Sequence, residues 1–110
     1  MLQLSIHIFR NSFTMKELEK RFANVALTYP GMTLYDKESA LRLINACERK
    51  NVAIFGIDGF SILKEGVQPN LDHSADFEIM KIPRNSTYSF ARKFLSERPE
   101  EMYFEIVCDE

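Results

Sequence analysis

The stretch that most constrains the fold runs over residues 51–77 and reads NVAIFGIDGFSILKEGVQPNLDHSADF. Two extended apolar segments are joined there by the short polar turn at residues 64–66, which predicts a β-hairpin. Gly66 suits the end of this turn because glycine adopts a positive φ without a Cβ penalty. Gly56 and Gly59 fall within the first strand, where a glycine marks either a bulge or the close approach of another backbone.

Apolar periodicity predicts the elements that precede the hairpin. Residues 2–8 alternate apolar and polar side chains, as is typical of a half-buried strand. A capping box that begins at Thr14 predicts a helix, which we expect to end at the Pro-Gly pair at 30–31. A second helix is expected from its N-cap residue Asp36 to a left-handed stop at Asn51, because apolar residues recur between them at helical spacing.

The same reasoning gives the elements that follow the hairpin. We expect the return strand to continue past Phe77 to Pro83, a third helix to run from about Ser86 to Pro99, and a last strand to cover residues 102–107. This order predicts one α+β domain over residues 1–110, with a mostly antiparallel sheet of four to five strands and helices packed on one face. The other face of the sheet is then available for a binding surface.

Composition narrows the class of protein. With 45% apolar residues, including nine Phe and four Tyr, a chain of 110 residues can bury a real core. Its first ten residues lack the features of a signal peptide, and no stretch approaches the roughly 20 apolar residues of a membrane span. Cys47 and Cys108 show no paired spacing. We therefore expect a cytoplasmic protein that does not cross a membrane.

Acidic residues are concentrated in two segments. Residues 52–82 carry five acidic and two basic residues, and residues 97–110 carry six acidic and one basic, whereas residues 1–51 are mildly basic. If the two segments lie side by side, their charge suits a basic protein partner and disfavours nucleic acid. The predicted partner-binding residues are Asp58, Glu65, Asp72, Asp76 and Glu78.

Strand alternation separates two of these five residues. Glu78 is opposite in phase to Phe77 and Ile79, so we expect its side chain to be exposed. Asp58 lies between isoleucine and glycine, where its carboxylate can instead serve a structural hydrogen bond.

The sequence contains no catalytic signature. Asp72, His73 and Asp76, together with His7, are a conceivable metal site, but their spacing is not that of a usual zinc or iron site. A polar loop whose carboxylates bind backbone amides explains the same residues. Cys47 falls on an apolar helical face, where a thiol behaves as a small hydrophobe. We therefore predict no catalytic residues, no metal and no cofactor.

Residues 54–60, which read IFGIDGF, and the GVQP at 66–69 resemble a segment of an immunity-protein family from bacterial polymorphic toxin systems. The segment of that family runs Ile-Leu-Gly-Gly-Asp-Val-Tyr, followed by a glycine, an apolar residue and a proline. The matching positions are Ile54, Gly56, Asp58, Phe60, Gly66 and Pro69. Ile57 and Gly59 depart from it, and the chain lacks the tryptophan of the family. The resemblance covers about a third of the chain.

The resemblance implies a cytoplasmic inhibitor that binds and neutralises a cognate toxin domain, often a nuclease, in contact-dependent growth inhibition. An acidic surface suits this function, because it can block the basic cleft of a nuclease. Two alternatives stay open. One is a small enzyme or a metal- or ligand-binding domain that uses Asp72, His73 and Asp76. The other is a structural or regulatory interaction domain whose acidic residues are merely solvated.

Overall fold

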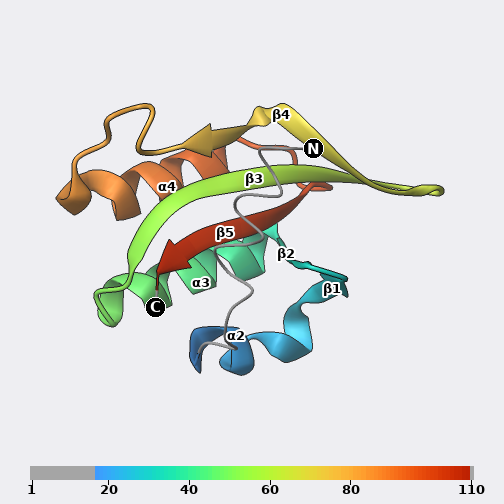
Figure 1. Cartoon of the computed structure of the whole chain (residues 1–110), viewed down its shortest axis with the longest axis horizontal. Coiled ribbons are helices and arrows are strands. Elements are labelled where there is room, and N and C mark those ends of the chain that lie inside the picture. Colours follow the sequence, from blue (N-terminus) through green and yellow to red (C-terminus); the bar gives the residue numbers. More distant parts are fainter. Residues whose placement is uncertain (1–16, 110) are drawn as a thin grey trace.

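The structure, a computed structural model, describes residues 17–109, so the strand expected at residues 2–8, the Thr14 capping box and His7 lie outside the described part. The described residues form one five-stranded sheet in the order β1-β2-β5-β3-β4, and every neighbouring pair of strands is antiparallel (Figure 1). The strands are β1 (Leu27–Tyr29), β2 (Met32–Asp36), β3 (Ala53–Leu63), β4 (Gly66–Asp76) and β5 (Tyr103–Asp109). The α+β class predicted from the sequence is confirmed.

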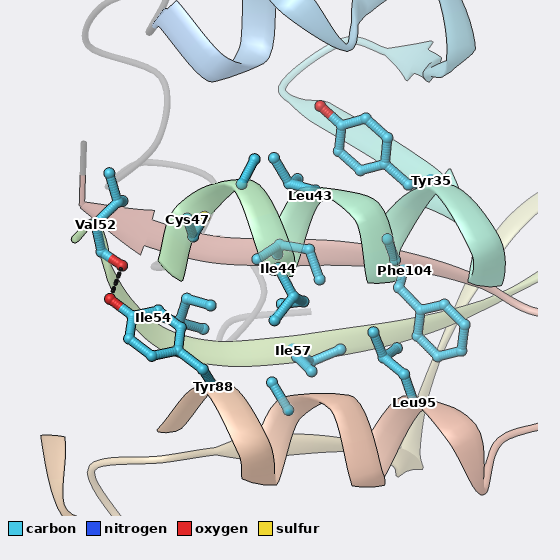
Figure 2. Packing of buried hydrophobic residues seen from close by; sticks show 14 of the residues in the cluster. Tyr35, Leu43, Ile44, Cys47, Val52, Ile54, Ile57, Tyr88, Leu95 and Phe104 are labelled. Atoms are coloured by element: carbon cyan, nitrogen blue, oxygen red, sulfur yellow. Dashed lines mark hydrogen bonds between the residues drawn. The ribbon is translucent and has the colours of Figure 1, made fainter. Parts of the chain in front are cut away.

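Helices cover one face of this sheet, as expected. They are α2 (Glu17–Arg21), α3 (Lys37–Arg49) and α4 (Thr87–Ser96), with the short 3-10 helices η1 (Ala23–Val25) and η2 (Arg84–Ser86). α3 and α4 contact each other, and α3 lies against β5 while α4 lies against β3 (Figure 1). The main core fills the space between them: Ile44 of α3, Ile57 of β3 and Leu95 of α4 are fully buried in it (Figure 2).

The long helix α3 begins and ends where the sequence predicts. The Oδ1 atom of Asp36 accepts a hydrogen bond from the backbone N–H of Ser39 at 2.8 Å, which satisfies one of the unpaired amides of the first turn. Asn51 has a φ of 58°, the left-handed conformation that ends a helix. The chain then enters β3 after one residue, so α3 is held directly against the sheet.

The segment between α2 and α3 differs from the prediction. A helix was expected up to residues 30–31, but helical structure ends at η1, and β1 and β2 form a hairpin instead. Tyr29 pairs with Met32 across the Pro30-Gly31 turn, and Gly31 has a φ of 76°. Pro followed by a glycine of positive φ is typical of the centre of a type II turn, so the pair connects two strands rather than ending a helix.

The return strand is also shorter than predicted. β4 ends at Asp76, and residues 77–81 form a helical turn that closes with Lys81 at a φ of 58°. Asp76 causes this ending because its Oδ1 accepts hydrogen bonds from the backbone N–H groups of Glu78 and Ile79, both at 3.0 Å. A carboxylate that binds these amides stabilises a turn in competition with an extended strand.

The second face of the sheet is buried along its centre. Phe60 of β3 and Leu34 of β2 are fully buried there. Asp58 and Glu105 face each other on β3 and β5, and their exposed fractions are only 9% and 3%. The expectation that this face is available for binding is therefore wrong along these two strands. The nearly continuous apolar run of β3 is typical of a strand that is buried on both faces.

Candidate functional site in the β3–β4 hairpin

The hairpin of β3 and β4 extends beyond the rest of the sheet. Strand β5 accompanies β3 only as far as the pair formed by Phe60 and Tyr103. Beyond that point residues 61–68, which we call the outer half, pair with each other around the loop formed by Lys64 and Glu65, and no other described strand pairs with them. Figure 1 shows that this half runs past the ends of α3 and α4. Both faces of the outer half therefore lie away from the main core.

A bulge in β4 marks the base of the outer half. Ile57 pairs with Ala75 and Gly59 pairs with Asn70, so residues 71–74 of β4 lie opposite the single residue Asp58. The Oγ atom of Ser74 accepts a hydrogen bond from the Gly59 N–H at 2.9 Å and donates one to the Asn70 carbonyl oxygen at 2.8 Å. These bonds give the bulge a fixed shape.

Both strand glycines have the role that the sequence predicts. A Cβ atom at Gly59 would collide with the carbonyl oxygen of His73, and one at Gly56 would lie 2.7 Å from the carbonyl oxygen of Ala75. Register shifts occur next to each glycine, between Gly59 and Ile57 and between Gly56 and Ile54. The close approach of β4 to β3 thus requires residues without side chains.

Arg98 connects the bulge to the end of α4. Its Nη1 donates to Nδ1 of His73 at 3.1 Å and lies 3.4 Å from the carbonyl oxygen of Asp72. Its guanidinium group lies over the ring of Phe94 at 4.3 Å from the centroid, and Nη2 is 3.7 Å from a carboxylate oxygen of Glu97. The sequence did not predict this contact, which we call the Arg98–His73 brace. The two residues are 25 positions apart, and only the fold brings them together.

Exposed apolar side chains lie along the hairpin and on the turn that follows it. Leu71 of the bulge is 75% exposed and Ile79 of the turn is 70% exposed. The large hydrophobic residues that are exposed in the described part of the chain are Val25, Ile62, Leu63, Leu71, Ile79 and Met80. All except Val25 belong to the hairpin or its following turn. That turn lies at the opposite end of β4 from the projecting loop (Figure 1), so the projecting part carries Ile62 and Leu63, with Leu71 in the bulge.

One face of the hairpin carries a shallow concavity of about 380 Å³, which we call the hairpin hollow. Its lining residues are Ser61, Gln68, Pro69, Asn70, Leu71 and Asp72. Ser61 and Gln68 are opposite each other in the strand pair, and Asn70 lies on the same face two residues along β4. The lining residues therefore include a serine, two amide residues and an aspartate, together with Pro69 and Leu71.

The five predicted partner-binding residues occupy different surroundings. Glu65 lies exposed in the loop at the tip, Asp72 lies exposed in the bulge, and Glu78 lies exposed in the turn after β4. Asp76 is half-buried and caps that turn, while Asp58 is buried opposite Glu105. The two acidic segments do lie side by side as β3 and β5, but the pair at their centre is buried and does not contribute to an acidic surface.

The exposed carboxylates of the hairpin differ from those on the helices in their pairing. On the helices, Glu17 lies 2.7 Å from Lys50 Nζ and Glu97 lies 2.8 Å from Lys93 Nζ. In each case the hydrogen bond and charge of the lysine hold the pKa of the glutamate below its usual value. Within residues 17–109, Glu65, Asp72 and Glu78 form no such ion pair. Their charge is available to a partner.

Two of the three residues of the alternative metal site make other contacts. Nδ1 of His73 faces Arg98, and Oδ1 of Asp76 is bound to two backbone amides. In the part of the chain that the structure describes, no three His, Cys, Asp or Glu side chains are grouped closely enough to hold a metal ion. The hydrogen bonding of Asp76 is instead the polar-loop arrangement weighed in the sequence analysis.

No protein-family model matches the chain, and no curated protein matches it significantly. None of the helices within residues 17–109 combines the length and the apolar composition needed to cross a membrane.

Proposed function

We propose that the chain is an immunity protein, a non-enzymatic cytoplasmic inhibitor that binds and neutralises a cognate toxin domain. The partner class is a basic nuclease, whose active site or substrate cleft the inhibitor covers. One observation carries the proposal: the projecting β3–β4 hairpin presents exposed apolar side chains beside carboxylates that have no ion-pair partner in the described part of the chain. The resemblance of residues 54–60 to the immunity family agrees with it.

The two kinds of side chain have different tasks in such a complex. Burial of Leu71, Ile62 and Leu63 against a partner removes apolar surface from water and supplies affinity. The carboxylates of Glu65, Asp72 and Glu78 attract a basic partner and accelerate its encounter with the hairpin. This surface is narrower than the one predicted from the sequence, because Asp58 is buried and Asp76 serves the turn.

Co-expression with the protein encoded immediately upstream tests the proposal, because an immunity gene lies next to the gene of its toxin. The wild-type chain should form a stoichiometric complex with that protein and restore the growth of cells that produce it. An upstream protein that is harmless, or whose toxicity persists when this chain is present, would contradict the proposal.

A matched pair of variants links protection to the hairpin. Leu71→Ser removes an exposed apolar side chain from the bulge, and Val25→Ser removes one from η1 on another part of the molecule. Both positions are exposed, so neither change should unfold the protein. Protection should weaken in the Leu71 variant and persist in the Val25 variant, whereas equal protection by both would argue against the hairpin.

A further inference from the structure

We infer that the hairpin hollow seats an arginine or lysine side chain of the partner protein, an inference that rests on the proposed function. The hollow is lined by Ser61, Gln68, Pro69, Asn70, Leu71 and Asp72. Asp72 is the charged member of this lining, and its carboxylate has no ion-pair partner in the described part of the chain. A cation that enters the hollow therefore meets a negative charge and neutral hydrogen-bonding groups.

The neutral polar groups of the lining suit a donor-rich ligand. The side chains of Ser61 and Gln68 each offer an oxygen that can accept a hydrogen bond. Oδ1 of Asn70 accepts one bond from the Asp72 N–H at 3.1 Å, and a carbonyl oxygen of this kind has a second lone pair. Arginine presents five N–H donors and lysine three, so either head group can use several of these acceptors together.

The apolar part of the lining suits the stem of the same side chains. Leu71, one of the lining residues, is 75% exposed and has an aliphatic side chain. Lysine and arginine carry aliphatic stems that pack on apolar groups while their charged ends stay in polar surroundings. An acidic or purely apolar side chain would leave either Asp72 or the amide groups without a complementary partner.

The basic residue that contacts this segment does not compensate Asp72. Arg98 binds the carbonyl oxygen of Asp72 and the ring of His73, and its second terminal nitrogen is directed to Glu97. The same contacts hold the bulge in place, together with the hydrogen bonds of Ser74. The hollow is therefore formed before a partner arrives, which lowers the entropy cost of binding.

Kinetics of the complex with the upstream-encoded protein test the inference. Asp72→Asn should raise the dissociation rate about tenfold, because the cation then loses its charged acceptor in a partly desolvated contact. Asp72→Glu keeps the charge and should dissociate more slowly than the asparagine variant. Glu101→Gln is the matched control, since Glu101 is exposed and lies outside the hollow, and it should dissociate like the wild type.

Substitutions in the partner identify the seated group. Each exposed arginine or lysine of the partner is replaced by methionine, one at a time, and the dissociation rate is measured with the wild-type chain and with Asp72→Asn. At one partner position, Asp72→Asn should no longer change the dissociation rate. Additive effects at every position would mean that Asp72 acts only at long range and would overturn the inference. If the wild-type chain binds but the Asp72→Asn variant dissociates no faster than it does, the inference is overturned and the proposed function stands. Failure of the wild-type chain to bind would overturn both.

Discussion

Two tyrosines in the core differ in what their hydroxyl groups contact. Tyr88 donates a hydrogen bond to the carbonyl oxygen of Val52 at 2.7 Å (Figure 2). Its hydroxyl also receives a hydrogen bond from Nη1 of Arg84 at 3.0 Å. Tyr35 is only 2% exposed and packs edge-on against Phe22, yet its buried hydroxyl has no hydrogen-bond partner among residues 17–109. Removing the Tyr88 hydroxyl should therefore lower stability, whereas removing the Tyr35 hydroxyl should not.

Tyr88→Phe should lower the free energy of unfolding by about 1–2 kcal/mol. The change leaves the Val52 carbonyl oxygen without its hydrogen bond in a buried position. Urea denaturation measures the loss, and an unchanged midpoint would show that the bond contributes nothing.

Tyr35→Phe should leave the free energy of unfolding unchanged or raise it by up to about 1 kcal/mol, because it removes a buried hydroxyl that has no partner. The same urea experiment, with Tyr88→Phe as the comparison, measures this. A loss as large as that of Tyr88→Phe would mean that the Tyr35 hydroxyl makes a stabilising contact.

Alkaline pH offers a second test at Tyr35. Burial, followed by the nearby charge of Glu19, raises the pKa of this phenol well above its usual value of about 10. As pH rises above about 10, the phenol ionises in the unfolded state but stays protonated in the folded state. The unfolded state is then favoured, so stability should fall with pH, and Tyr35→Phe should reduce that fall. Identical pH profiles for the two proteins would contradict the effect.

At the scale of elements, the bulge depends on Gly59. Gly59→Ala should destabilise the protein by about 3 kcal/mol, because the new Cβ would collide with the backbone of His73. Gly66→Ala is the comparison: a Cβ there meets nothing within 4 Å, and only its φ of 141° opposes the change, at a cost of about 1 kcal/mol. Thermal unfolding should show a larger loss of stability for Gly59→Ala than for Gly66→Ala. A smaller loss for Gly59→Ala would mean that β4 moves away from the new Cβ easily.

The elements that sequence could predict are those with strong local signals. Helix α3 has an N-cap, an apolar face and a left-handed stop, and the hairpin has two long apolar strands around a polar turn. Strand β1 was misassigned because the helical spacing before it was extended to the Pro30-Gly31 pair, and strand β2 was not predicted. The end of β4 was misplaced because two hydrogen bonds to the Asp76 carboxylate outweigh the apolar alternation that follows.

The site was less predictable than the fold for a different reason. Burial of Asp58 depends on Glu105 of β5, which lies opposite it, and exposure of Leu71 depends on the bulge that interrupts the pairing of β4 with β3. The pairing of Asp58 with Glu105, and the brace between Arg98 and His73, involve residues far apart in the sequence. Glycines at 56 and 59 were the local signal of the bulge, but they do not reveal its four-residue length.

At the scale of the whole molecule, exposed charge at the two ends of the hairpin should control how fast a basic partner is captured. Glu65→Lys and Glu78→Lys should each slow association about two- to tenfold at low salt, with little effect at high salt. Glu101→Lys has the same change in net charge outside the hairpin and should slow it less. Stopped-flow association rates measure this, and equal slowing by all three variants would mean that only net charge matters.

Amide hydrogen exchange of the chain, alone and mixed with the upstream-encoded protein, tests most directly whether the hairpin is the inhibitory surface. Exchange should slow in the complex at residues 61–72, while the exposed side of α3 exchanges as in the free protein. A complex that slows exchange on α3 and α4 but leaves residues 61–72 unchanged would contradict the assignment of binding to the hairpin.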